Sequence, residues 1–417
     1  MKNSKASYTK ILLRPGKDHI LNFGHPWIFS QALAGATNDL QLTTYNKKIK
    51  NGEIADVYSS DGKRFLARGY YNGNSQIAVR ILTHDSNEEI DEEFFAKRFR
   101  DFLAIRERFI DTKKTNAFRV VFGESDSLPG LIVDKYNRVF VIQIHTLGMD
   151  CLRSKVIAAM KRVFNPETIF EKSDLGVRIQ EDLKDKPVQL LYGKNLPDEI
   201  EILENGVKFL VNIKDGQKTG FFLDQRENRK ILQKYVAGKH VLNCFCYTAG
   251  FSVYAALAPH GGAKETINID VSGPALETAK RNFKINGLKL QNHQFLDKDV
   301  FDALADFENK KEKFDIIILD PPAFVKNQKS LKQGLSGYLF INEHALNLLP
   351  QGGILVSSSC SAHVTDKMFT RMLSQAASRA HCVLKTLEIA HQPIDHPFNP
   401  HFPEGKYLKF YIMLKVE

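Results

Sequence analysis

The apolar segment at residues 314–319, Phe-Asp-Ile-Ile-Ile-Leu, constrains the fold more than any other feature of the sequence. It has the length of a β-strand but almost no polar alternation, which is typical of a parallel strand covered on both faces. Similar segments recur on either side of it, separated by stretches with helical periodicity. This alternation predicts a doubly wound α/β sheet with right-handed crossovers. The predicted strands are residues 241–245, 266–270, 314–320 and 354–359.

The N-terminal part of the chain has a different pattern, with short β-like segments up to about residue 84. Residues 54–58 and 64–69 flank Asp61-Gly62, a pair that favours a tight hairpin turn, and residues 76–82 alternate like a further strand. We expect a small β-barrel here, preceded by a helical or looped segment at Gly24-His25-Pro26-Trp27.

The chain between these two patterns is expected to hold a helix and a second small domain. Residues 87–109 repeat Phe, Ile and Leu at helical spacing and predict an amphipathic linker helix that begins near a cap at Ser86. The next stretch predicts a small α+β unit, with strands at 131–134, 139–144 and 188–191 and a helix near 152–164. The predicted domains are thus a β-barrel at 1–84, a linker helix at 85–117, a central α+β domain at 118–195 and the doubly wound domain at 196–417.

Two further elements are predicted in the second half of the chain. After residue 196 we expect a hairpin with strands at 207–213 and 221–223, joined by a turn at Asp215-Gly216. A helix from Gln225 to about residue 235 follows it. The final run, residues 407–416, alternates in part and is expected to close the sheet as an antiparallel edge hairpin.

The composition narrows the class of protein. The 417 residues carry a net charge of +10, which favours polyanionic partners such as nucleic acid. No apolar run reaches about 18 residues, and residues 1–10 lack the apolar core of a signal peptide, so we expect a cytoplasmic protein. The five cysteines are thinly spread and form no disulfide framework. Cys244 and Cys246 lack further ligands for zinc, so no metal is expected.

A cofactor site is predicted where the first strand of the doubly wound sheet ends. Ligands of such sheets bind beyond the carboxyl ends of the strands, where the strand order reverses. Asn243 and Phe245 stand at the end of this strand, and Gly250 follows in the turn before the next helix, where it would let the backbone approach a ligand closely. We assign all three to cofactor binding.

Acidic residues at the next strand ends indicate an adenosine cofactor. Asp270 lies about 20 residues beyond the turn, where a carboxylate binds a ribose diol, although it could also only cap the following helix. Asp299 is a candidate for the adenine edge, with Asp297 as its rival. The turn lacks the glycines that a pyrophosphate needs, which argues against NAD and favours S-adenosylmethionine.

The sequence Asp320-Pro321-Pro322-Ala323-Phe324 ends the apolar strand and predicts a substrate site. Two prolines remove two backbone donors, so carbonyl groups and the Asp320 carboxylate can accept hydrogen bonds from a base. Pro321, Pro322 and Phe324 are the predicted substrate contacts, with the aromatic ring able to stack.

Cys360 follows the next strand and would lie near Asp320 at the same edge of the sheet. A buried cysteine is often only a packing residue. A thiolate would nevertheless explain methylation of cytosine at carbon 5, because that carbon becomes nucleophilic only after addition at carbon 6. Cys360 is therefore the predicted nucleophile and Asp320 its catalytic partner.

Several motifs that span nearly the whole chain together carry a resemblance to a known family. They are Gly24-His25-Pro26-Trp27, Lys218-Thr219-Gly220-Phe221-Phe222-Leu223-Asp224-Gln225-Arg226, Asn243-Cys244-Phe245-Cys246-Tyr247-Thr248-Ala249-Gly250, the Asp320-Pro321-Pro322 loop, Ser359-Cys360-Ser361, Asp395-His396-Pro397 and Pro403-Glu404-Gly405-Lys406-Tyr407-Leu408-Lys409. With them the chain resembles the bacterial family of 23S ribosomal RNA large-subunit methyltransferase I, which methylates cytosine at carbon 5.

This resemblance implies an N-terminal PUA domain that binds RNA, a small central domain and a class I methyltransferase domain that uses S-adenosylmethionine. It implies Cys360 as the nucleophile and Asp320 as the residue that holds the base. It also implies that Asp224, Gln225 and Arg226 border the cofactor pocket. A homodimer is an expectation at the level of the family.

Alternatives stay open at this point. An Asp-Pro-Pro loop with an aromatic residue is typical of enzymes that methylate amino groups, although the aromatic stands one position later here. An RNA-binding assembly factor that no longer turns over is a second alternative. No general base for the carbon-5 proton is evident: Asp395 and His396 are candidates, but a structural loop is the favoured interpretation of their segment.

Overall fold

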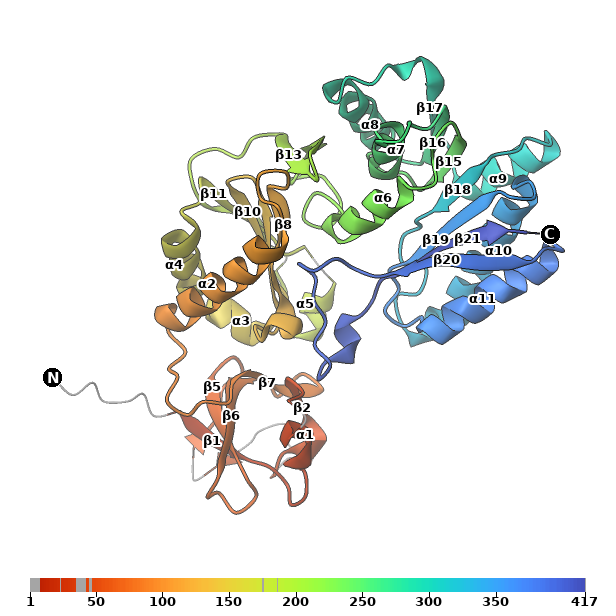
Figure 1. Ribbon diagram of the computed structural model, residues 1–417. Helices are drawn as coiled ribbons and strands as arrows, with labels where there is room; N and C mark the ends of the chain where they lie inside the picture. The colour runs from red at the N-terminus through yellow and green to blue at the C-terminus, as the bar shows by residue number, and fades with distance from the viewer. Residues whose placement is uncertain are drawn as a thin grey trace. The chain divides into compact units, whose positions relative to one another are not determined.

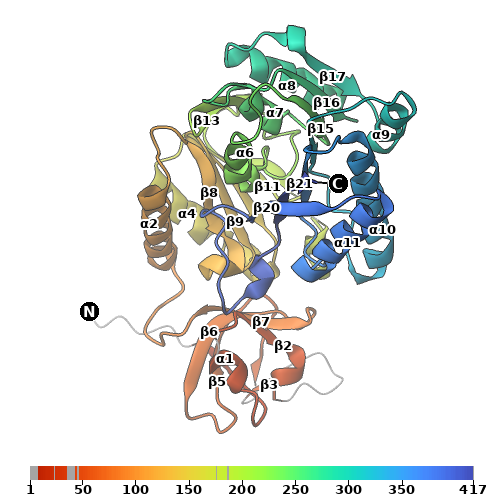
Figure 2. The same ribbon diagram turned by 45° about the vertical axis from the view of Figure 1, so that its right-hand side comes forward.

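The computed structural model describes residues 8–22, 24–34, 43–44, 47–174, 176–185 and 187–416. The chain forms two compact units (Figures 1 and 2). The first unit comprises Met1–Ile200, Val211–Phe221 and Ile394–Gly405. The second unit comprises Glu201–Leu210, Phe222–Pro393 and Lys406–Glu417. No helix within the described ranges is long and apolar enough to cross a bilayer.

The N-terminal part of the first unit is a five-stranded sheet in the order β1-β5-β6-β7-β2. Its hairpin between β5 and β6 turns at Gly62, whose φ of 71° suits glycine. The three predicted strands are confirmed to within two residues. The elements are β1 (Thr9–Leu12), α1 (His19–Asn22), β2 (Trp27–Phe29), η1 (Ser30–Ala32), β3 (Thr43–Thr44), β4 (Lys47–Lys48), β5 (Ile54–Tyr58), β6 (Phe65–Tyr71) and β7 (Ile77–Thr83).

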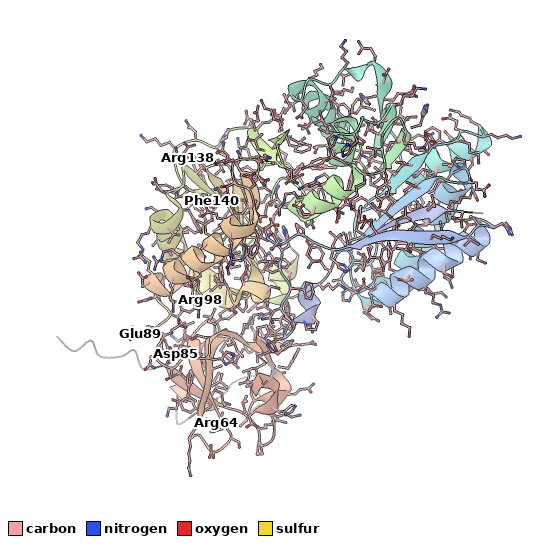
Figure 3. All side chains as sticks on the ribbon, in the orientation of Figure 1. Arg64, Asp85, Glu89, Arg98, Arg138 and Phe140 are labelled. Atoms are coloured by element: carbon pink, nitrogen blue, oxygen red, sulfur yellow. The ribbon has the colours of Figure 1, made fainter. Side chains whose placement is uncertain are left out.

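The predicted amphipathic helix is α2 (Glu92–Phe109), but its predicted cap at Ser86 is wrong. The N-cap is Asp91, whose carboxylate accepts the Phe94 N–H at 2.9 Å. The residues before it form the turn between β7 and α2, which contains Asp85 and Glu89 (Figure 3). Helix α2 also buries Phe94, Phe95 and Phe99 in the core of the central sheet, so it is a structural layer of that domain.

The central sheet has the order β12-β11-β10-β9-β8, with α2 and α4 packed together against it (Figure 1). Phe140 of β10 stacks on Phe164 of α4 at 4.8 Å. Prediction missed β8 and β11. The elements are β8 (Ala117–Phe122), η2 (Gly123–Asp126), β9 (Leu131–Tyr136), β10 (Val139–Ile144), α3 (Leu147–Cys151), α4 (Arg153–Phe164), β11 (Thr168–Lys172), α5 (Val177–Gln180) and β12 (Val188–Tyr192).

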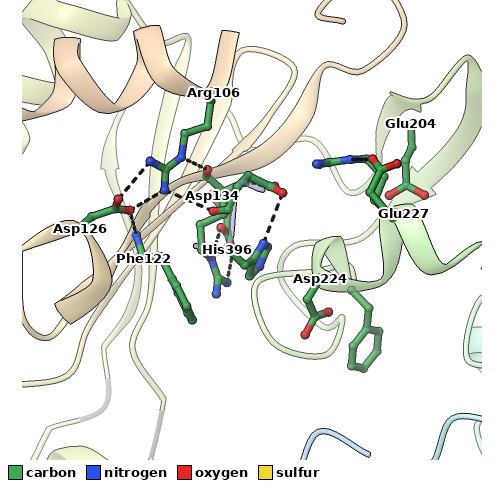
Figure 4. Close-up of polar contacts among 12 residues, drawn as sticks. Arg106, Phe122, Asp126, Asp134, Glu204, Asp224, Glu227 and His396 are labelled. Atoms are coloured by element: carbon green, nitrogen blue, oxygen red, sulfur yellow. Dashed lines mark hydrogen bonds and ion pairs between the residues drawn. The ribbon is translucent and has the colours of Figure 1, made fainter. Parts of the chain in front are cut away.

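Two segments from later in the chain pack into the first unit and are held by buried arginines. Arg106 binds the Asp126 carboxylate with both terminal nitrogens, at 3.0 and 2.5 Å, and also donates to the Asp395 carbonyl (Figure 4). Arg119 binds the buried Asp134 carboxylate at 2.7 and 2.8 Å. Thr219, from the 211–221 segment, donates to the same carboxylate at 2.7 Å.

The second unit confirms the doubly wound α/β fold. Its seven-stranded sheet has the order β17-β16-β15-β18-β19-β21-β20, with parallel pairing from β17 to β19 and antiparallel pairing around β21. The strands are β15 (His240–Cys244), β16 (Glu265–Asp270), β17 (His293–Asp297), β18 (Ile316–Leu319), β19 (Ile354–Ser359), β20 (Leu384–Ala390) and β21 (Lys409–Lys415). The predicted C-terminal strand exists, but it lies inside the sheet and β20, which was not predicted, forms the edge.

Helices cover both faces of this sheet. One apolar core lies under α9, α10 and α11, and a second lies under α6 and α7. Both faces of β18 are therefore buried, as its composition predicted. The helical elements are η3 (Leu223–Gln225), α6 (Arg226–Leu232), α7 (Gly250–Ala256), α8 (Gly273–Ile285), η4 (Leu290–Asn292), α9 (Val300–Asn309), η5 (Gln328–Ser330), α10 (Leu331–Leu348), α11 (Asp366–Arg379) and η6 (Pro403–Gly405), the last in the first unit.

The predicted hairpin after residue 196 is wrong, because the strand that begins at Val207 pairs with the segment before it instead of the segment after it. The observed hairpin joins β13 (Ile200–Glu204) to β14 (Val207–Val211) and turns at Asn205-Gly206, where both residues have positive φ. Residues 221–223 form no strand. Asn282 of α8 and Asn286, the residue that caps its C-terminus, accept backbone N–H groups of β14 and so hold the hairpin in place. Local turn chemistry could not reveal these contacts, which join residues more than 70 positions apart.

Candidate active site

The predicted site residues all lie in the second unit, around the carboxyl ends of its parallel strands. Strand β15 pairs with β16 on one side and β18 on the other, so the strand order reverses there. Asn243 lies on β15, and Phe245, Asp320 and Cys360 each directly follow a strand. Asp270 ends β16, Asp299 caps α9, and Gly250 begins α7. The remaining predicted residues are Asp224 of η3, Arg226 of α6 and the three residues Pro321, Pro322 and Phe324 of the loop after β18.

The loop between β15 and α7 has an unusual backbone. Phe245, Tyr247 and Ala249 have φ values of 58°, 49° and 57°, in the left-handed region that glycine adopts most easily. Strain of this kind costs about 1–3 kcal/mol per residue and is found mainly at functional sites. Here it is offset by tertiary contacts: the Tyr247 N–H donates to the Asp270 carboxylate at 2.8 Å, and the Cys246 N–H to the Ile269 carbonyl at 2.9 Å.

Gly250 has a structural reason for lacking a side chain. A Cβ there would lie 3.0 Å from the Cδ atom of Arg229, whose guanidinium binds the buried Glu204 carboxylate at 2.8 Å with two nitrogens. The glycine thus makes room for a buried ion pair beneath the loop. Close approach of a ligand to Gly250 stays a prediction.

Asp270 was predicted to bind a diol, and its hydrogen bonds leave room for this role. Its two oxygens accept one backbone N–H each, from Tyr247 at 2.8 Å and Ser272 at 3.0 Å. A carboxylate can accept about four hydrogen bonds, so acceptor capacity is left on both oxygens. Asp297 is level with Asp270 on the neighbouring strand, whereas the Asp299 carboxylate accepts the Phe301 N–H at 2.7 Å and caps α9.

Asp320 belongs to a polar network that the sequence did not reveal. The Gln225 amide donates to Asp320 at 2.9 Å and to the Ser358 hydroxyl at 3.1 Å, and Asn228 donates to the Gln225 carbonyl oxygen at 2.6 Å. This network brings η3 and α6 to the ends of β18 and β19. Gln225 belongs to the motif at residues 218–226, and this was the only indication in the sequence that it lies near the site.

The neighbours of Gln225 are buried in the same region. The Asp224 carboxylate accepts the Tyr407 hydroxyl at 2.6 Å, and the Arg226 guanidinium donates to Glu227 at 2.9 Å. Both side chains are almost fully buried. Their placement beside the Asp320 network is compatible with a cofactor pocket, and their contact with a cofactor stays a prediction.

The loop after β18 presents its residues unequally. Pro321 is buried and Pro322 is exposed. The Phe324 ring packs among Phe245, Phe301 and Tyr338, with centroid distances of 6.1, 6.0 and 4.8 Å. This aromatic cluster gives Phe324 a packing role that the sequence did not predict, so Pro322 is the better candidate for contact with a substrate.

Cys360 is half-buried at the end of β19 and its backbone is held from two directions. The buried Tyr338 hydroxyl of α10 lies 2.9 Å from the hydroxyls of both Ser359 and Ser361. From β21, the Lys409 ammonium donates to the carbonyls of Ser361 and Val364, both at 2.7 Å. Strand pairing sets Leu319 opposite Ser357, so Asp320 is level with Ser358 and Cys360 lies two residues further along.

The residues at this edge fit an adenosyl cofactor of methyl transfer. Asp270 offers acceptors for a ribose, and the strained loop approaches the same strand ends without the glycines of a pyrophosphate site. The described residues contain no group of three or more His, Cys, Asp or Glu side chains that could hold a metal ion.

Family models identify the class of protein. Residues 177–400 match the model for S-adenosylmethionine-dependent methyltransferases, and residues 11–84 match a PUA-like domain. Over 98% of its length the chain also superposes on all of a candidate SAM-dependent methyltransferase from Streptococcus mutans, with a TM-score of 0.80 and 26% identity. A second structure, of a methyltransferase in complex with SAH, superposes with a TM-score of 0.82 and is also 26% identical. The superposition covers 98% of this chain and all of the other. The fold and the site therefore define an S-adenosylmethionine-dependent methyltransferase with an N-terminal PUA-like domain.

Two curated relatives identify the family. The ribosomal RNA large subunit methyltransferase I of Tolumonas auensis is 42% identical over 402 residues, which cover 96% of this chain and 98% of the relative. That of Aeromonas salmonicida is 39% identical over 399 residues, which cover 96% and 97%. The chain belongs to the ribosomal RNA large subunit methyltransferase I family.

Replacing Asp270 by alanine is expected to weaken S-adenosylmethionine binding about 10- to 100-fold. The change removes a charged hydrogen bond to the ribose, worth about 1.5–3 kcal/mol, and also the acceptor that holds the Tyr247 N–H. Isothermal titration calorimetry measures the affinity. Glu277→Gln, an exposed carboxylate change on α8, is the control and should bind within twofold of the parent. Equal affinity for the parent and Asp270→Ala would remove Asp270 from the cofactor site.

Proposed function

We propose that the protein methylates carbon 5 of a cytosine in 23S ribosomal RNA through a covalent adduct with Cys360. The observation that carries this proposal is the position of a half-buried thiol directly after β19, two residues beyond the level of Asp320 on the neighbouring strand. Methylation of a ring or exocyclic nitrogen needs no thiol at this place. The names of the curated relatives support ribosomal RNA of the large subunit as the substrate.

The chemistry assigns a separate role to each residue. The Cys360 thiolate adds to carbon 6 of the cytosine, which makes carbon 5 nucleophilic. Asp320, oriented by Gln225, holds the base by accepting a hydrogen bond from its amino group. Bound S-adenosylmethionine supplies the methyl group as an electrophile. Water takes the carbon-5 proton, and the electron pair left behind restores the double bond between carbons 5 and 6, which breaks the carbon–sulfur bond and returns the thiolate.

The N-terminal domain supports RNA as the partner. A PUA-like domain precedes the methyltransferase, and the net charge of +10 favours association with a polyanion. Asp395 is not proposed as the general base, because its carboxylate accepts the Arg119 N–H at 3.0 Å in a buried cluster of the first unit. A homodimer is proposed from the family alone, and sedimentation of the purified protein would test it.

Mass spectrometry of nucleosides tests this function. Ribosomal RNA from cells that lack the protein should lose 5-methylcytidine at one position of the 23S molecule, and incubation of that RNA with the protein and S-adenosylmethionine should restore it. Restoration of a nucleoside methylated on nitrogen would contradict the cytosine-C5 proposal. No change in any methylated nucleoside would indicate the non-catalytic alternative.

A further inference from the structure

Lys409 is a buried cation beside the proposed nucleophile, and the sequence motif that contains it carried no assigned role. It lies opposite Ser359 in the antiparallel pairing of β19 with β21, one residue from Cys360. The residue as a whole is 4% exposed. Its ammonium donates to the carbonyls of Ser361 and Val364, in the turn that follows Cys360.

An ammonium group has three N–H donors, and these two carbonyls use two of them. The third donor has no partner among the described residues, and Cys360 is one of the groups whose charge acts on Lys409. The other charged groups facing Lys409 are Asp366 at the start of α11 and Lys406, which bind each other at 3.1 Å. From α10, the buried Tyr338 hydroxyl faces the same turn.

We propose that Lys409 is a positioning residue that stabilises the thiolate of Cys360. In the active form the thiol proton resides on the Lys409 nitrogen or in solvent, so that a thiolate lies beside an ammonium. Where the Lys409 amine is neutral, it takes the thiol proton, so that the S–H bond breaks and an N–H bond forms. Where Lys409 is already an ammonium, the thiol proton passes to water. This inference rests on the proposed function, because it concerns the nucleophile of that reaction.

The electrostatics of the site support such a pair. Burial lowers the pKa of Lys409 to about 8, while Asp366 and Cys360 act in the opposite direction. The ammonium form therefore dominates at pH 7, and the pKa of Lys409 lies close to the ordinary pKa of a cysteine thiol. Attraction between an ammonium and a neighbouring thiolate favours the charged form of both groups.

Strand β21 offers a matched control at its other end. Lys415 donates to the carbonyls of Leu346 and Leu349 at 2.8 and 2.9 Å, and burial lowers its pKa as well. Its neighbouring thiol is Cys382, in place of Cys360. Changing either lysine to glutamine removes a cation from β21 and retains a donor for carbonyl oxygens. Only the change at Lys409 should alter the reactivity of Cys360.

The test is the pH dependence of alkylation of Cys360 by iodoacetamide, followed by peptide mass spectrometry on the full chain without RNA. In the parent the midpoint should lie below about 8.5, the ordinary pKa of a thiol. Lys409→Gln should raise the midpoint by about one unit and slow alkylation at pH 7 about tenfold, because only the thiolate reacts. Lys409→Arg should retain the parental midpoint, and Lys415→Gln should leave Cys360 unchanged.

Two results would overturn the inference. One is an unchanged midpoint in folded Lys409→Gln. The other is an equal rise in Lys409→Arg, which would indicate a structural effect independent of charge. Methyl transfer to RNA is measured in parallel on the same variants. If Lys409→Gln shifts the midpoint but the parent protein does not methylate carbon 5, the inference about Lys409 is supported and the proposed function is rejected. The two failures are therefore distinguishable.

Discussion

Cys360→Ala is expected to lower the rate of methyl transfer to RNA by at least about 10³-fold while S-adenosylmethionine binds within about twofold of the parental affinity. Carbon 5 of cytosine is too weak a nucleophile without prior addition of a thiolate, so the loss falls on the chemical step. The cofactor contacts proposed for Asp270 come from β16 and its loop and do not involve Cys360. Transfer of a radioactive methyl group to RNA measures the rate, and calorimetry measures the affinity.

A second cysteine of the same unit provides the control. Cys382, in the connection between α11 and β20, is half-buried, and Cys382→Ala should retain parental activity. RNA that contains 5-fluorocytosine should trap the parent as an adduct stable to denaturation, because fluorine cannot leave as a proton does. Cys360→Ala should form no adduct. Methylation by Cys360→Ala at the parental rate would refute the covalent mechanism and favour methylation on nitrogen.

Arg119→Met is expected to destabilise the first unit by about 3–5 kcal/mol. The Asp134 carboxylate is fully buried, and Arg119 is its bidentate partner. Without the guanidinium, the buried charge keeps the Thr219 hydroxyl as its only side-chain donor within the described part of the chain, which does not compensate for its desolvation. Denaturant unfolding can be followed in this unit alone, because Trp27 is the single tryptophan of the chain and belongs to it.

Arg138→Met, in the turn between β9 and β10 of the same domain, is the control. Arg138 binds Glu167 at 3.0 Å, but both side chains are more than half exposed, so the loss should stay below about 1 kcal/mol. The double variant Arg119→Met/Asp134→Leu should recover much of the lost stability, since it removes the uncompensated charge. Similar losses for Arg119→Met and Arg138→Met would contradict the role of burial in this argument.

Local sequence patterns were sufficient to predict those features that depend on a single segment of the chain. The apolar run of β18 predicted a strand covered on both faces, and two helical layers do cover it. Asp320, Asp270 and Cys360 were predicted from their positions at strand ends, where the structure places them. The cap of α2 was mislocated because several polar residues before the helix can accept an N–H, and only the turn geometry selects Asp91.

Other features depend on contacts between distant segments. Gly250 was assigned to a ligand, although the nearest atoms to its missing side chain belong to Arg229. Stacking of Phe324 on a base stays a prediction, and the sequence did not reveal that its ring packs with Phe245, Phe301 and Tyr338. In each case the residue type indicated that the position is special. The residues that contact it are distant in the sequence, so they could not be identified from local patterns.

The doubly wound sheet was therefore determined by the sequence alone, because hydrophobic periodicity is a local property of each strand and helix. The surroundings of the nucleophile were decided by tertiary structure. The insertion of β21 between β19 and β20 brings Lys409 beside Cys360, although 48 residues separate Lys409 from the Ser361 carbonyl that it binds. Pairing register and burial set the charge and reactivity of a thiol, and neither can be obtained from residue spacing.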